Sequence, residues 1–167
     1  RFVAGTVGQP GERTFFIQAR TGSKLISVSL EKTQVQALSE RLTYMIREIK
    51  QSDPTIIIQK LTRDDEPLET PIEEEFRVGV IGLAFESSRE LIQIDLQAVA
   101  EGDEEEPEFI DVDDLRSDQD IMRVLISPSM ADQFAKRALS VVNAGRLPCP
   151  FCGGPIDMRG HLCPRAN

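Results

Sequence analysis

Hydrophobic and polar residues alternate along the first part of the chain in the pattern typical of β-strands. Three segments show this alternation, and two groups of turn-forming residues, Gln9-Pro10-Gly11 and Thr21-Gly22-Ser23, separate them. A period of two places alternate side chains on opposite faces of a strand. We therefore predict a three-stranded antiparallel meander over residues 2–8, 13–20 and 24–31.

The spacing of the apolar residues then changes to the period of a helix. Thr33 belongs to a residue type that favours helix N-caps, and Asp53-Pro54 is a strong stop signal. Between them, the apolar positions at helical spacing are Val35, Leu38, Leu42, Met45, Ile46 and Ile49. The pattern predicts a helix within these limits. The apolar segment 55–61 fits neither period, and 64–75 is an acidic, proline-containing connector.

The second half of the chain repeats this order of patterns. Residues 76–82 match residues 2–8 as F-x-x-G-x-[VI]-G, and 90–99 and 121–127 predict the second and third strands. A second helix is predicted from Ser129 to about Ala144. A constant offset relates the segment from Ile26 through Leu38 and Arg41 to Met45 with the segment from Met122 through Phe134 and Arg137 to Val141. This self-similarity predicts an internal duplication.

The predicted fold class is α+β. Two pseudo-symmetric βββα units form an antiparallel sheet with helices packed on it, because neither unit can bury its sheet face alone. The duplicated domain spans 1–147, with repeat one at 1–52, the connector at 53–74 and repeat two at 75–147. A small zinc-binding knuckle follows at 148–167. The acidic stretch 101–120 is interpreted as a solvated insertion between two strands of the second repeat.

Composition narrows the class of protein. The chain has 167 residues, 40% of them hydrophobic, which suits one domain with a sizeable core. Its net charge of −9, with no Trp and one Tyr, argues against a nucleic-acid partner. No apolar run approaches the roughly 20 residues that cross a bilayer, so we expect no membrane association. Cysteines confined to metal-ligand spacing indicate a reducing compartment, and we predict cytoplasmic localisation.

The strongest chemical signal lies near the C-terminus. All three cysteines and the only histidine fall in one short window with the spacing C-x2-C-x8-H-x-C. Three thiolates and one imidazole are the ligand set of a closed, tetrahedral, structural zinc site. We predict Zn²⁺ bound by Cys149, Cys152, His161 and Cys163. The alternatives are unliganded thiols, iron, and a catalytic Cys–His pair, and the last leaves two cysteines unexplained.

Two other groups of residues have a structural and a functional interpretation. Gly5, Gly8, Gly79 and Gly82 lie within or beside strands, where glycine indicates bulges or close packing. The alternative is close approach of the backbone to a ligand or a partner. Arg41 and Arg137, at equivalent helix positions, are interpreted as structural residues that pack at the sheet edge, with anion recognition as the alternative.

No motif for catalysis is present, and no catalytic residue is predicted. The sequence has no G-x-S-x-G elbow, no Walker pattern and no histidine besides the metal ligand. We therefore predict a non-enzymatic protein in which the zinc module presents a binding surface to a protein partner. The alternative is an enzyme or small-ligand sensor with a pocket at the interface of the two repeats, near the four glycines.

Three blocks of sequence carry a family resemblance. They are F-V-A-G-T-V-G-Q-P-G-x-R-T-F-F-I-Q-A-R at 2–20, P-I-E-E-E-F-R-V-G at 71–79 and C-P-F-C-G-G-P-I-D-M-R-G-H-L-C-P-R-A-N at 149–167. With them the chain resembles an uncharacterised bacterial domain-of-unknown-function family, found mainly in high-GC Gram-positive bacteria. The resemblance implies no substrate and no catalytic residue. It also implies that family members continue a few residues beyond both ends.

Overall fold

The computed structural model describes residues 1–100, 108–116, 118–145, 149–152, 163 and 165. The first half comprises β1 (Phe2–Val7), β2 (Thr14–Thr21), β3 (Lys24–Leu30) and α1 (Lys32–Ser52). The second half comprises β4 (Glu74–Glu86), β5 (Leu91–Ala98), β6 (Glu108–Ile110), the 3₁₀ turn η1 (Val112–Asp114), β7 (Ile121–Ile126) and α2 (Pro128–Asn143). These bounds confirm the predicted strands and helices and show that β4 extends further than predicted.

The two helices begin at residues other than those predicted. The N-cap of α1 is Glu31, not Thr33: its backbone N–H donates to the side-chain oxygen of Gln34 at 2.8 Å. In α2 the N-cap is Ser127, whose hydroxyl accepts from the backbone N–H of Met130, with Pro128 in the first turn. The Asp53-Pro54 stop is confirmed, since α1 ends at Ser52. The segment 55–61, unassigned from the sequence, is neither helix nor strand.

One seven-stranded sheet joins both halves in the order β1-β2-β3-β4-β5-β7, with β6 paired to β4. The pairs β1–β2, β2–β3, β4–β5 and β5–β7 are antiparallel. Two pairs are parallel: β3 with β4, which joins the halves, and β4 with β6 inside the second half. The predicted all-antiparallel sheet is therefore wrong, and the sheet is mixed. The connection between β3 and β4 explains the parallel pairing. The chain runs back through α1 and the connector before β4 begins, and a parallel neighbour requires such a long crossover connection.

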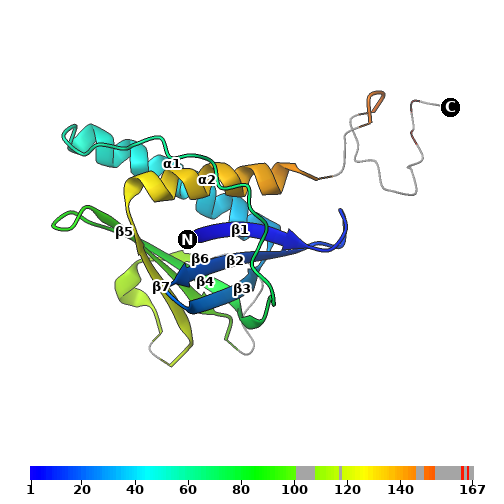
Figure 1. Cartoon of the computed structure of the whole chain (residues 1–167), viewed down its shortest axis with the longest axis horizontal. Helices are drawn as coiled ribbons and strands as arrows, with labels where there is room; N and C mark the ends of the chain where they lie inside the picture. The colour runs from blue at the N-terminus through cyan, green and yellow to red at the C-terminus, as the bar shows by residue number, and fades with distance from the viewer. Residues whose placement is uncertain (101–107, 117, 146–148, 153–162, 164, 166–167) are drawn as a thin grey trace.

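Both helices pack against each other and over the same side of the sheet (Figure 1). Their apolar stripes, including Val35, Leu38 and Phe134, are buried with the inner faces of the strands. The rings of Phe2 on β1 and Phe134 on α2 stack with centroids 4.4 Å apart. The second helix thus covers the first strand. No helix in the described part of the chain is long and apolar enough to cross a membrane.

A segment of the connector covers the outer face of β1 and β2. Gln18, buried on β2, donates from its amide to the carbonyl of Glu69 and accepts from the Glu69 backbone N–H, at 2.9 and 2.8 Å. Beside it, Leu68 lies over Gly5, so closely that a Cβ on that glycine would come within 2.6 Å of the leucine side chain. The connector is therefore a packed layer of the fold.

The described part of the acidic stretch covers the outer face of β4 and β5 in the same way. Gln97, buried on β5, donates to the carbonyl of Arg116 at 2.6 Å and accepts from the Arg116 backbone N–H at 3.3 Å. Val112 and Leu115 approach Gly82. Residues 108–116 thus add a strand and a cover to the sheet, which corrects their interpretation as a solvated insertion. Residues 101–107 lie outside the described part of the chain.

Arg137 joins three parts of the fold at the edge of the sheet. It lies on α2 and is 7% exposed. Its guanidinium donates to the carbonyl of Ala4 on β1 at 2.8 Å, to the carbonyl of Glu66 at 2.8 Å, and to both the carbonyl and the carboxylate of Asp64. Burial lowers the pKa of Arg137, and the Asp64 carboxylate opposes that shift. These contacts confirm the structural interpretation of this arginine.

Replacing Arg137 with leucine is expected to destabilise the fold by about 3 kcal/mol, because it leaves the carbonyls of Ala4 and Asp64 without this donor and removes one of the two arginines that contact the Asp64 carboxylate. The matched control is Arg41→Leu. Arg41 occupies the corresponding position on α1 but is exposed, with its guanidinium 4.6 Å from the centre of the Phe109 ring. Its loss is expected to cost less than about 1 kcal/mol. Urea unfolding of both variants measures the difference, and equal effects would contradict this role of Arg137.

Asp64 is expected to make stability depend on acid pH. A hydrogen bond from Arg1 holds its pKa below the usual value, and the charge of Arg137 acts in the same direction. A depressed pKa stabilises the folded state above about pH 4 and loses that effect as the pH falls. The difference in unfolding free energy between wild type and Asp64→Asn should therefore shrink below about pH 4. A difference independent of pH between 7 and 2.5 would show that the carboxylate charge does not matter.

Candidate metal centre

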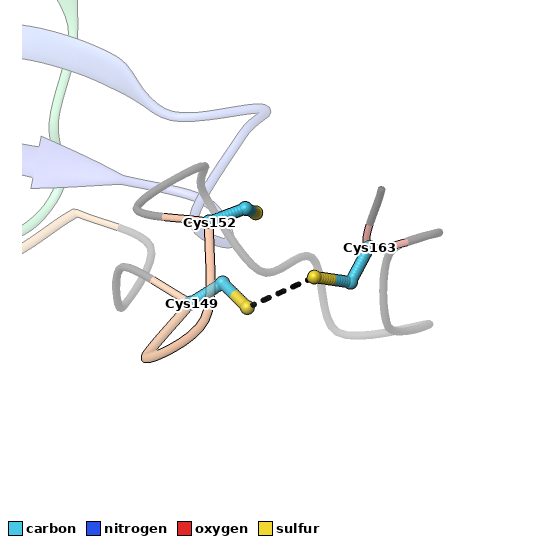
Figure 2. Close-up of side chains that lie close together, drawn as sticks. All are labelled: Cys149, Cys152 and Cys163. Atoms are coloured by element: carbon cyan, nitrogen blue, oxygen red, sulfur yellow. Dashed lines mark hydrogen bonds between the residues drawn. The ribbon is translucent and has the colours of Figure 1, made fainter. Parts of the chain in front are cut away.

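The three cysteines converge although they come from two separate pieces of chain. Cys149 and Cys152 lie on one tight turn that follows α2, and Cys163 approaches from the end of the chain (Figure 2). Their three sulfur atoms all lie within 4.8 Å of one another. Cys149 is buried, and the other two are half-buried. The structure thus brings together the three predicted thiol ligands. His161, the predicted fourth ligand, lies outside the described residues.

The distance between sulfur atoms fits a shared metal ion. The Sγ atoms of Cys149 and Cys163 are 3.7 Å apart, far beyond the roughly 2.05 Å of a disulfide bond. In a tetrahedral zinc site with Zn–S bonds of about 2.3 Å, two sulfurs are separated by about 3.8 Å. The Cys149–Cys163 pair therefore has the length of one edge of a tetrahedral coordination shell, and the Cys152 sulfur lies within 4.8 Å of both. Three cysteines at this separation are able to hold a metal ion.

Local backbone geometry favours a thiolate at Cys149. Burial opposes ionisation of this thiol, but hydrogen bonds from the backbone of Cys152 and Phe151 outweigh burial, and the pKa of Cys149 lies below its usual value. Burial raises the pKa of Cys163, and its cysteine neighbours act in the same direction. The turn therefore presents one stabilised thiolate beside a second thiol whose ionisation is opposed. A pair of thiols of this kind is able to bind a metal cation, and metal binding displaces the proton that remains on the second thiol.

Two arginines hold the ends of this segment. Arg165 donates from its guanidinium to the carbonyl of Phe151 at 3.4 Å, which links the end of the chain to the turn with the first two cysteines. At the other end, Arg13 on the β1–β2 hairpin donates to the carbonyl of Ala144 at 3.2 Å, where α2 ends. The hairpin thus fixes the point from which the cysteine segment departs, at the far end of α2 from β7 (Figure 1).

The four glycines predicted as alternative approach points have the chain's own atoms around them. Leu68 lies over Gly5, and the backbone of Val99 would meet a Cβ on Gly79 at 2.8 Å, where the register of β4 and β5 shifts. Gly82 faces Val112 and Leu115 of the segment 108–116. Gly8 has a φ of +100°, and a Cβ on it would come within 2.8 Å of the Glu12 carbonyl oxygen in the β1–β2 turn. These observations favour the close-packing interpretation of the glycines.

The structure also assembles a cavity between the two halves, but none of the four glycines that marked the alternative pocket in the sequence lines it. It has a volume of about 400 Å³ and lies between β7 and the first three strands. Phe2 and Ile26 come from the first half of the chain, and Met122 and Met130 from the second. No local pattern connects residues so distant in sequence. The pairing of β3 with β4 and the packing of α2 on α1 and β1 bring the two halves together so that such a junction arises.

The chain belongs to the family described as "Protein of unknown function (DUF3090)", whose model matches residues 1–163. The match spans the domain and all three cysteines, so the resemblance to an uncharacterised family is confirmed. No curated protein and no solved structure matches the chain. Neither the family nor any relative therefore supplies a substrate or a residue role, and the function has to be argued from the chain itself.

The cysteine cluster is expected to retain a metal ion through purification without added metal. Elemental analysis should give about one equivalent per chain, because four ligands from one protein bind tightly. Cys149→Ser and Cys163→Ser should each lower this value strongly. Ser127→Ala, at the start of α2 and far from the cluster, is the control and should leave it unchanged. Less than half an equivalent in wild type, or full retention in both cysteine variants, would contradict the site.

Proposed function

We propose that this chain is a non-enzymatic, cytoplasmic zinc-binding protein in which a structural Cys₃His centre presents a surface to a protein partner. The observation that carries the proposal is the convergence of three sulfurs within 4.8 Å of one another, with the Cys149–Cys163 pair at 3.7 Å. His161 completes the proposed coordination, since an imidazole among thiolates favours zinc over iron. Four protein ligands leave no position for a catalytic water, which supports a structural role for the metal.

The place of the centre in the fold supports an interaction role. The cysteine turn follows α2 and stands apart from the buried core of the sheet and helices (Figure 1). Phe151, inside the turn, is 64% exposed. A zinc ion that orders a short segment and holds an aromatic side chain in water provides a contact that a partner is able to bury. We propose that residues 148–167 form this module and residues 1–147 the supporting domain.

We also infer that the two halves of residues 1–147 are related by duplication. Each half has three strands in antiparallel succession followed by a helix, and the second half has β6 in addition. The support comes from the two buried glutamines, Gln18 on the second strand of the first half and Gln97 on the second strand of the second. Each exchanges two hydrogen bonds with the backbone of the segment that covers it. Superimposing the two glutamines in this way matches Gly5 with Gly82, whereas the sequence motif matches Gly5 with Gly79, three residues earlier.

The alternative function, an enzyme or ligand sensor with a pocket between the repeats, has one observation in its favour. A cavity does lie between the two halves, at β7. Its described lining contains arginines and a lysine but no carboxylate, histidine or cysteine. It therefore lacks a base beside a nucleophile among those residues. We favour the interaction role for this reason.

Affinity capture from native cells tests the interaction role. The bait is the full chain, compared with a chain truncated at Pro148 and with Cys152→Ser. A specific protein partner should be recovered with wild type and lost with both variants, because both remove the ordered metal module. Urea unfolding checks that the domain of each variant remains folded. An identical set of partners for all three baits would show that the cysteine segment is not the binding surface.

A further inference from the structure

The cavity between β7 and the first three strands runs along the edge of a strand. Five consecutive residues of β7, Met122 to Ile126, line it. Alternate residues of a strand point to opposite faces of a sheet, so a cavity on one face would contact every second residue. Contact with all five indicates that the cavity faces the backbone edge of β7. The strand order agrees, because β7 is the last strand of the sheet and pairs on one side with β5.

The hydrogen-bond pattern shows which backbone groups face this edge. The Ala98 N–H donates to the Asp120 carbonyl at 2.8 Å, which makes this pair hydrogen-bonded. Antiparallel pairs alternate between bonded and non-bonded positions, so Met122 and Val124 bond to β5. Ile121, Arg123 and Leu125 then direct their backbone N–H and C=O groups away from β5. Of these, Arg123 and Leu125 line the cavity and present their backbone donors and acceptors to it.

The opposite edge of the sheet, strand β1, is covered by α2. The β1 carbonyl of Ala4 accepts a hydrogen bond from Arg137, and α2 packs against this strand. A folded protein usually covers or blocks a free edge, because the edge is a template for another strand. Here β1 is covered from within the chain, while β7 has a cavity of about 400 Å³ beside its edge.

The surroundings of the cavity define the chemistry of an occupant. Apolar side chains, Phe2, Ile26 and Met130 among them, form one part of the lining. Arg1, Arg20, Lys24 and Arg123 form the other, and no carboxylate lies among the described lining residues. The arginines pair with Asp64, Glu69 and Asp95, which lie outside the lining. Lys24 is exposed, and no ion pair involving it occurs among the described residues.

We propose that the edge of β7 binds an extended peptide segment of a partner protein by strand addition. The added strand pairs with the backbone of Arg123 and Leu125 and places alternate apolar side chains in the cavity. An acidic residue of the peptide lies near Lys24. Recognition of this kind takes its affinity from main-chain hydrogen bonds and its specificity from pockets for alternate side chains. The proposal rests on β7 and is independent of the metal centre.

A random-peptide library displayed on phage, selected on the full chain, tests this proposal. We expect peptides with apolar residues at alternate positions and an acidic residue at one end. A synthetic peptide of the strongest sequence is then titrated by fluorescence anisotropy against wild type and Leu125→Pro. Proline removes the N–H that faces the cavity but none that bonds β5, so the edge is blocked while the ladder is kept. Binding should weaken at least about tenfold.

Three further variants make the test specific. Leu125→Ala keeps the N–H and should bind within about threefold of wild type. Lys24→Glu, an exposed change, should weaken acidic peptides and spare neutral ones. Cys149→Ser should bind as wild type does, even if the metal proposal fails. The proposal is overturned if no peptide is enriched, if Leu125→Pro binds equally well, or if decanoate binds the cavity while peptides do not. Should Leu125→Pro not fold, backbone amide shifts of Arg123 and Leu125 on peptide addition decide the question.

Discussion

The guanidinium of Arg137 is the contact on which the arrangement of this chain depends. It lies on the last helix, and its partners are the first strand and the connector between the two halves, at Ala4, Asp64 and Glu66. A buried cation retains its charge in such a place only when hydrogen bonds and a carboxylate replace water. By satisfying an edge carbonyl of β1, it closes one side of the sheet and fixes α2. The position of α2 in turn determines where the cysteine turn begins, while pairing with β5 places β7.

Fixing α2 at both ends separates two regions with different chemistry. Near the start of the helix, Met130 lies beside the open edge of β7, where backbone donors and acceptors face a cavity. At its end, Arg13 holds the carbonyl of Ala144, and the chain passes into the cysteine turn. The first region is the one proposed to bind an extended peptide, and the second holds three cysteines that are able to bind a metal ion. The proposed interaction role would use both.

Local patterns predicted the elements, while long-range contacts determined what the sequence left open. Periods of two and of three to four residues located the strands and helices, and ligand spacing located the three cysteines. The parallel pairing of β3 with β4 was missed, because it depends on where α1 and the connector cross and not on any local pattern. The packing of residues 108–116 on the sheet does not follow from the sequence, because their many carboxylates suggest a segment surrounded by solvent. In the structure Phe109 pairs with β4 and contacts Arg41, and Leu115 lies over Gly82. Arg41 and Arg137 occupy equivalent positions in the sequence, but only Arg137 is buried, because the connector and β1 pack against it.

The central claim is that Cys149, Cys152 and Cys163 share one zinc ion with His161. X-ray absorption at the zinc edge of the purified full chain tests it most directly, because it reports ligand type, number and distance together. The account predicts three sulfur ligands at about 2.3 Å and one nitrogen ligand at about 2.0 Å. His161→Ala should remove the outer-shell scattering of the imidazole ring, with water in place of the histidine nitrogen, and leave the three sulfurs. A shell of oxygen and nitrogen alone, or a spectrum unchanged in Cys163→Ser, would contradict it.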